Sequence, residues 1–227
     1  MPLLVLLLVF AAILGPPLWA RAVLARHGVE RDDIPGNGGE FARHLLRKAG
    51  LTDYTVEAAS AGKGDHFDPS RRCVVLSAPH HERRSLAAVV VAAHEVGHAI
   101  QHYIGYRPLY ARQRLAQFAI GVERWGAIAL VAMPFVTVMT RSPAAGVLML
   151  IAGGAVMLVP VVVHLVTLPV EFDASFARAL PILERGYLAP DDLPAARRIL
   201  TACALTYVAG ALLALFNFRR WIRVLRR

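Results

Sequence analysis

The stretch at residues 85–103, SLAAVVVAAHEVGHAIQHY, determines how the rest of this chain is interpreted. Its apolar residues predict a buried helix, for which the opening serine is a suitable N-cap. His94, Glu95 and His98 stand in the middle of that helix. Burying a carboxylate and two imidazoles is costly unless a partner neutralises them, and a metal ion is one such partner.

The order His-Glu-x-x-His gives each of these side chains a separate task. His94 and His98 are four residues apart, so on a helix they share one face and can aim a ring nitrogen at one ion. Zinc is the usual metal for neutral imidazoles in a tetrahedral site. Glu95 points beside the ion and can take a proton from a zinc-activated water. The motif therefore predicts a zinc metallopeptidase with Glu95 as the catalytic general base. Gly97, which lacks a side chain, leaves space for another element to approach.

A third protein ligand has to come from outside the motif. His102 continues the spacing, but it lies two turns from His94, about 12 Å along the axis, which is too far for one ion. Glu171 and Asp173 lie in LPVEFDASFARAL, residues 168–180. If a helix begins near the proline of this stretch, the two acids point about 160° apart, so only one of them can face the motif helix.

The composition indicates a membrane protein. The chain has 227 residues, is 56% hydrophobic and carries a net charge of +9, mostly from arginine. Such a basic, apolar chain favours contacts with anionic lipid, and it contains no nucleic-acid-binding module. Its two cysteines do not form a disulfide framework. Four apolar segments, at residues 2–20, 125–140, 144–169 and 199–218, predict about four transmembrane helices.

We therefore expect a mainly α-helical integral membrane protein with a small α+β, zincin-like metallopeptidase region. Its parts would be an N-terminal membrane anchor (1–20), the zincin-like region with the motif helix (21–124), two transmembrane helices (125–169), a helical segment with the third ligand (170–198), a transmembrane helix (199–218) and a basic interfacial tail (219–227). Two crossings would separate the third ligand from the motif, and an even number returns the chain to the same face.

Short elements are expected within the zincin-like region. Residues 40–49 have the pattern of an amphipathic helix, YTVEAAS (54–60) and RRCVVLS (71–77) of strands, and GKGDHFDPS (62–70) of a loop. RRCVVLS is also a candidate edge strand that would hold an extended substrate by β-addition.

Several of these stretches together resemble one known family. SLAAVVVAAHEVGHAIQ, DHFDP, LVTLPVEFDAS and ALTYVAGAL are similar to segments of the bacterial membrane-embedded neutral zinc metallopeptidases, the YugP-like proteins. The resemblance extends over residues 36–218. It implies a membrane zinc peptidase with a glutamate as the third ligand.

A more distant resemblance concerns the third ligand. EFDAS is similar to the E-x-x-A-D segment of HtpX-type membrane zinc proteases, which implies that Glu171 is the ligand. Ser175 stands where those proteases carry an aspartate that supports a zinc-binding histidine. The groups that orient the zinc histidines therefore stay open, and the candidates are Ser175, His102 and the two carboxylates of DHFDP, Asp65 and Asp68.

The predicted function is a membrane-bound endopeptidase with one Zn²⁺ per chain, acting on a membrane or membrane-proximal polypeptide. The alternative is a catalytically silent, zinc-stabilised membrane scaffold or partner-binding protein. Glu95 argues against this alternative, because a purely structural zinc site does not need a base. The expected location is a bacterial plasma membrane, in multi-pass form. Arg21 and Arg26, which follow the first segment, predict a catalytic region facing the cytoplasm.

Overall fold

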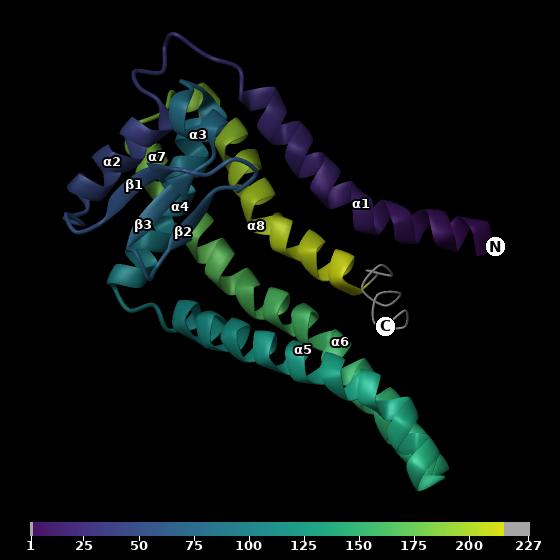
Figure 1. Ribbon diagram of the computed structural model, residues 1–227. Helices are drawn as coiled ribbons and strands as arrows, with labels where there is room; N and C mark the ends of the chain where they lie inside the picture. Colours follow the sequence, from purple (N-terminus) through teal and green to yellow (C-terminus); the bar gives the residue numbers. More distant parts are fainter. Residues whose placement is uncertain (1, 216–227) are drawn as a thin grey trace.

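The computed structural model describes residues 2–215 and part of the side chains of the long helices. The helix that carries the motif, α4 (Leu86–Tyr103), lies inside the compact body that the strands and short helices form at one end of the molecule (Figure 1). Its N-cap is Ser85, whose hydroxyl accepts from the backbone N–H of Ala88 at 3.2 Å. Every residue from Leu86 to Ala99 is buried, because other helices and the sheet contact α4 on several sides. This all-round burial explains why the helix is apolar on nearly every face.

A small layer of strands and short helices packs against α4 (Figure 1). It contains α2 (Gly38–Lys48), β1 (Thr55–Ala58), β2 (His66–Asp68), β3 (Cys73–Leu76) and α3 (Ala78–Glu82). Asn37 and Glu40 form a reciprocal capping box that fixes the start of α2. The three strands are arranged in the order β1-β3-β2, with β1 parallel and β2 antiparallel to β3.

This strand order corrects two expectations. All four residues of β3 are buried and both its edges are paired, so RRCVVLS is the central strand and the edge-strand prediction for it is wrong. The outer strand β2 lies inside the stretch that was predicted to be a loop. Its three residues are too few to show the alternating pattern by which a strand is recognised.

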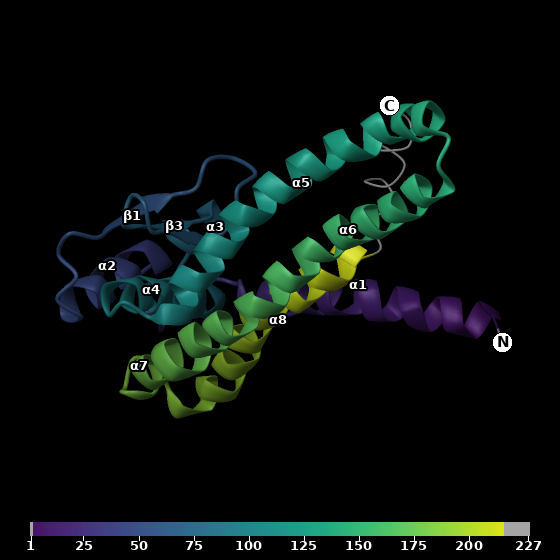
Figure 2. The ribbon, with the colours of Figure 1, turned by 90° about the horizontal axis from the view of Figure 1, so that it is seen from below.

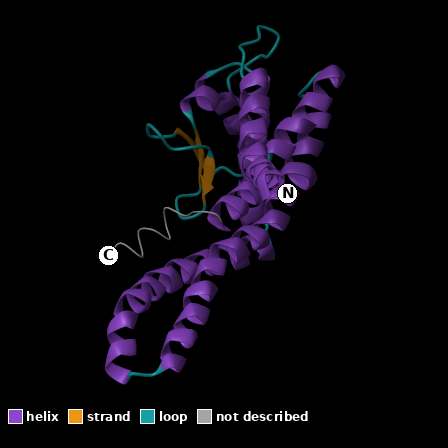
Figure 3. Cartoon of the chain, turned by 90° about the vertical axis from the view of Figure 1, so that its right-hand side faces the viewer, coloured by secondary structure: helices purple, strands orange, loops and turns teal. Residues whose placement is uncertain are grey.

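Four long helices account for the apolar segments. They are α1 (Pro2–His27), α5 (Arg107–Thr140), α6 (Pro143–Phe172) and α8 (Leu193–Leu215). The helices α5 and α6 form a hairpin that extends away from the sheet, and α8 packs against both α6 and α1 (Figures 2 and 3). The hairpin returns the chain to α4.

The prediction of about four transmembrane helices, and with it the fold class of a multi-pass membrane protein, is wrong. Within the residues that the structure describes, no helix is both long enough and apolar enough to cross a bilayer. Some of the apolar residues in these segments are instead buried inside the protein. In the fourth segment these are Ile199, Leu200, Ala202 and Ala204. The predicted orientation toward the cytoplasm rested on these crossings and loses its basis. The basic tail at 219–227 lies outside the described residues.

The chain after the hairpin is helical without a break at Pro169. The helix α6 continues through Glu171 and passes into a π-helical segment, η1 (Asp173–Ala179), then α7 (Leu180–Glu184), and after a turn a short 3₁₀ segment, η2 (Pro190–Asp192). The expectation that a helix begins near Pro169 is therefore wrong. Extra residues in a π-helical turn change which side chains share a face, and such turns often occur at functional sites.

The segment η1 packs directly on α4 at Gly97. A Cβ atom on Gly97 would lie 2.6 Å from the carbonyl oxygen of Ala174, which is closer than real contacts allow. The expectation that Gly97 makes room for another element is confirmed, and that element is η1.

Candidate metal centre

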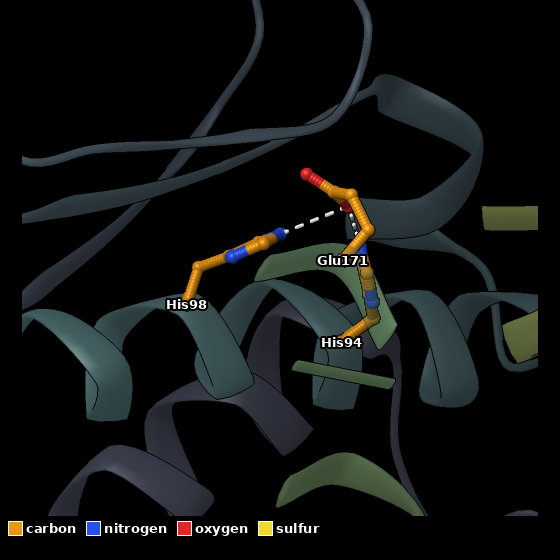
Figure 4. A group of neighbouring side chains, drawn as sticks. All are labelled: His94, His98 and Glu171. Atoms are coloured by element: carbon orange, nitrogen blue, oxygen red, sulfur yellow. Dashed lines mark ion pairs between the residues drawn. The ribbon is translucent and has the colours of Figure 1, made fainter. Parts of the chain in front are cut away.

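Three buried side chains from two distant parts of the chain converge beside α4. His94 and His98 project from α4, and Glu171 projects from the last turn of α6 (Figure 4). The Nε2 atoms of His94 and His98 each lie 3.3 Å from Oε2 of Glu171. One ligand atom from each residue can be chosen so that all three lie within 4.8 Å of one another. This is the arrangement that one ion can bridge.

The contacts behind His94 determine which ring nitrogen faces the centre. Its Nδ1 lies 3.0 Å from the hydroxyl of Ser175, and that hydroxyl also lies 3.3 Å from the carbonyl oxygen of Leu200. A carbonyl only accepts, so Ser175 donates its single hydrogen to Leu200 and accepts from His94 Nδ1–H. The lone pair of His94 Nε2 is then directed at the centre. His98 is held in the same sense, since its Nδ1 lies 2.9 Å from Oε1 of Gln101.

The centre consequently brings together three hydrogen-bond acceptors: Nε2 of His94, Nε2 of His98 and Oε2 of Glu171. Glu171 is 0% exposed, and its Oε2 has no hydrogen-bond partner within the described part of the chain. Buried acceptors that face one another without a donor are unfavourable until a cation lies between them. Two imidazoles and a carboxylate are ligands that zinc accepts. The buried group of His94, His98 and Glu171 therefore fits zinc binding.

The pKa directions at the centre agree with this electrostatic description. Burial favours the neutral form of Glu171, but the neighbouring His98 and His94 outweigh it and hold the pKa of this carboxyl well below its usual range. Burial also opposes protonation of His98, yet the Glu171 carboxylate raises the pKa of its ring above the ordinary value. The centre thus attracts positive charge.

Glu95 lies beside the ligands and opens onto a cavity. Burial raises its pKa. Glu95 and His98 line one side of a cavity of about 270 Å³, which lies between the β2 region and the first turns of α5. The other lining residues are Asp65, His66, Phe67, Pro69, Leu109, Arg112, Gln113, Ala116 and Gln117. Glu95 therefore faces the same space as His98.

The other predicted residues have different positions. Ser175 contacts His94, as described above. Asp65 lines the cavity but hydrogen-bonds to His80 and to the backbone N–H of Ser77, both at 2.7 Å. Burial favours the neutral form of Asp65, but the contacts with His80 and Ser77 together outweigh it and lower the pKa of this carboxyl.

Asp68, His102 and Asp173 do not join the group of three ligands. Asp68 accepts from the backbone N–H of Ser70 at 2.9 Å and so closes the turn after β2. His102 hydrogen-bonds through Nδ1 to the hydroxyl of Tyr54 at 2.7 Å. Asp173, the second acid of the third-ligand stretch, contacts Gln101 instead of a histidine ring.

Two residues at the centre were not singled out from the sequence. Gln101 follows His98 by three positions, a helical spacing that places it beside the ring and that could have pointed to it. Arg112 of α5 lies with one guanidinium nitrogen 3.4 Å from Oε1 of Glu171, the oxygen that does not face the histidines. Nothing in the pattern of α5 sets Arg112 apart from the other arginines, because its role depends on the return of the hairpin.

Comparison with known proteins agrees with this geometry. The family model described as "Putative neutral zinc metallopeptidase" matches residues 2–226. The chain is 35% identical over 221 residues to "Putative membrane protease YugP" of Bacillus subtilis (strain 168), covering 94% of this chain and 93% of that protein. No solved structure matches the chain. On the strength of a match that spans almost its whole length, the chain belongs to the neutral zinc metallopeptidase family.

Proposed function

We propose that this protein is a zinc-dependent endopeptidase that binds one Zn²⁺ through His94, His98 and Glu171. The observation that carries the proposal is the position of Glu95. A buried carboxylate with a raised pKa lines the same cavity as His98, next to three convergent ligand atoms. A structural metal site does not require such a group, so the geometry favours catalysis over a silent scaffold.

In the proposed reaction the residues of this chain bind the ion, orient the substrate and move a proton. Zinc, when bound, polarises the scissile carbonyl and makes a water molecule acidic enough to attack at neutral pH. The Glu95 carboxylate accepts the proton that this water loses and then donates it to the leaving amine nitrogen. Because burial raises the pKa of Glu95, its carboxylate is a stronger base than that of an exposed glutamate.

The substrate in this proposal is an extended polypeptide. The cavity at Glu95 is bordered by β2, an outer strand that pairs with β3 alone among the described strands. An extended peptide can add to such an edge through backbone hydrogen bonds and lie across the cavity. In this proposal β2 takes the role that the sequence suggested for RRCVVLS.

The proposed setting is a membrane, and the substrate a membrane or membrane-proximal protein. The Bacillus subtilis relative is named a membrane protease. Several large apolar side chains of the α5–α6 hairpin are exposed, among them Phe118, Trp125, Phe135, Met139 and Leu148. Exposed apolar surface of this extent typically marks a membrane or protein contact. Co-sedimentation with lipid vesicles checks this setting, and recovery of all the protein in the lipid-free fraction contradicts it.

The experiment that tests the function compares the wild type with Glu95→Gln. Both proteins should hold about one zinc per chain, because Glu95 is not a ligand, and Glu95→Gln alone should lose proteolysis. Membranes from cells that express each form are compared by proteomics, and uncleaved species that accumulate with Glu95→Gln identify the substrate. Zinc loss in a folded Glu95→Gln protein would count against the assignment of Glu95 as a base that is not a ligand, and identical proteomes would favour the scaffold alternative.

A further inference from the structure

Gln101 is a fully buried amide in the last turns of α4, and all of its polar atoms are in use. It is 0% exposed. Its Oε1 lies 2.9 Å from Nδ1 of His98, and its Nε2 lies 2.8 Å from the carbonyl oxygen of Val170 and 2.7 Å from Oδ2 of Asp173. One side chain of the motif helix thus reaches both a zinc-ligand histidine and the segment that carries Glu171.

The chemistry of these partners permits only one orientation of the amide. A backbone carbonyl and a carboxylate both accept hydrogen bonds, so the NH₂ group of Gln101 must face Val170 and Asp173. Its oxygen is left for His98, and this oxygen can only accept. His98 must therefore carry a hydrogen on Nδ1, which leaves the lone pair of Nε2 directed at the metal centre.

The two acceptors of the NH₂ group flank the third ligand. Val170 and Asp173 lie on either side of Glu171 in the chain, and Asp173 is itself held by Arg178, whose Nε donates to Oδ2 at 3.1 Å. Fixing these two positions fixes the turn from which Glu171 projects. The same amide therefore sets the ring of His98 and the position of the Glu171 turn relative to it.

We propose that Gln101 is a positioning residue that holds His98 and Glu171 in register as one preformed metal site. Arg178 and Asp173 extend this contact to the next turn of η1. The proposal rests on the metal centre of the proposed function, but it does not require that the protein cleave peptides. Its test therefore measures metal binding, and a failure of proteolysis leaves it standing.

The first test removes the hydrogen bonds and keeps the volume. Gln101→Met should weaken zinc binding by about 10- to 100-fold, the usual effect of losing a partner behind a ligand histidine. Zinc affinity is measured by competition with a chromophoric chelator. The matched control is Gln117→Met, the same change at an exposed position on the cavity rim, which should leave the affinity unchanged. Equal affinities in the wild type and Gln101→Met would overturn the proposal.

The second test separates the two ends of the amide. Gln101→Glu keeps an acceptor for His98 but loses the donor and sets a carboxylate against Asp173, so zinc affinity should fall about as far as in Gln101→Met. Adding Asp173→Asn supplies an amide donor for the new carboxylate and should recover most of the lost affinity. Asp173→Asn alone should bind nearly as well as the wild type. A Gln101→Glu protein with wild-type affinity, or a double variant without recovery, would show that the contact with η1 does not position the site.

The third measurement needs no variant. In metal-free wild-type protein, at a pH at which the ring is neutral, nitrogen NMR of the imidazole rings should find the hydrogen of His98 on Nδ1. A hydrogen on Nε2 instead would contradict the orientation of Gln101 and overturn the proposal. This result is decisive even if a substitution at position 101 prevents folding.

Discussion

At the scale of single residues, Glu171 and Asp173 are two acids of one short segment with different surroundings. Glu171 is fully buried with its Oε2 between two imidazoles, while Asp173 is bound by Gln101 and Arg178. We expect Glu171→Ala to lower zinc content as severely as His98→Ala, because each removes a ligand. Asp173→Ala should lose far less, since it removes only one of two acceptors of the Gln101 amide. Zinc content by atomic emission checks this, and equal retention in Glu171→Ala and Asp173→Ala would contradict it.

At Gly97 helix α4 closely approaches η1, the segment that directly follows the helix carrying Glu171. Gly97→Ala places a methyl group 2.6 Å from the backbone oxygen of Ala174, so η1 must move away from α4. Overpacking of this kind costs about 1–3 kcal/mol, more than the gain of about 1 kcal/mol in helix propensity. We expect a lower thermal unfolding temperature and weaker zinc binding, because Ser175 belongs to η1.

A matched control for this substitution exists on another helix. A Cβ atom added at Gly121 in α5 would meet nothing within 4 Å, so Gly121→Ala gains helix propensity without a clash. Its unfolding temperature should be unchanged or slightly higher, and its zinc affinity unchanged. If Gly97→Ala behaves in the same way as Gly121→Ala, the close approach of η1 is not a constraint on the site.

At the scale of elements, Asp65 joins the outer strand to the helix that follows the sheet. It precedes β2 and hydrogen-bonds to Ser77, which precedes α3, and to His80 within α3. The contacts with His80 and Ser77 together outweigh burial, so the folded-state pKa of Asp65 lies below its unfolded value. The stability it contributes is therefore present above about pH 4, the unfolded value, and is lost as pH falls through the folded value.

The corresponding variant is Asp65→Asn. At pH 7 it should lower the free energy of unfolding by about 1–3 kcal/mol, the effect of weakening buried hydrogen bonds to a charged group. The difference from the wild type should shrink below about pH 4, where the wild-type carboxylate also becomes protonated. Asp53→Asn, at an exposed carboxylate, is the control. Denaturant unfolding at both pH values checks the prediction, and a pH-independent difference would contradict it.

The elements also explain how much of the molecule could be predicted from the sequence. The pattern around His94 and His98 predicts α4 and two ligands, because residues four apart on a helix share a face whatever surrounds them. The residues that hydrogen-bond to the proposed ligands are harder to predict from the sequence. Gln101 can contact Asp173 only because η1 packs on α4 at Gly97, and the sequence pattern of α4 does not predict that packing. No local sequence pattern predicts a π-helical turn such as η1 or a three-residue strand such as β2. The apolar segments predict long helices, but not that α8 turns Ile199 and Leu200 into the interior.

At the scale of the whole molecule, the metal centre joins regions that the α5–α6 hairpin separates in sequence. Two of the proposed ligands, His94 and His98, lie in the body formed around α4 and the sheet, and the third, Glu171, lies at the returning end of the hairpin (Figures 1 and 4). An ion bound there fixes α6 to α4 in addition to the packing between η1 and α4. Without the ion, the buried Oε2 of Glu171 has no hydrogen-bond partner within the described residues. Removing the metal should therefore destabilise the contact between α6 and α4 first.

Chelation should therefore destabilise the protein, and it should do so locally first. A ligand that binds only the folded state stabilises it by about 4 kcal/mol at a free concentration one thousand times its dissociation constant. For a chain of this size, each kcal/mol corresponds to about 2–4 °C in unfolding temperature, so removing zinc should lower that temperature by roughly 10 °C. Glu171→Ala, which lacks a ligand, should respond much less to the chelator. Hydrogen exchange should accelerate at residues 169–179 before it does in α2 or β3, because only the former are tied to the ion. A uniform increase in exchange rate across all elements would contradict this prediction. It would mean that zinc stabilises the whole body and does not act mainly by joining α4 to the returning end of the hairpin.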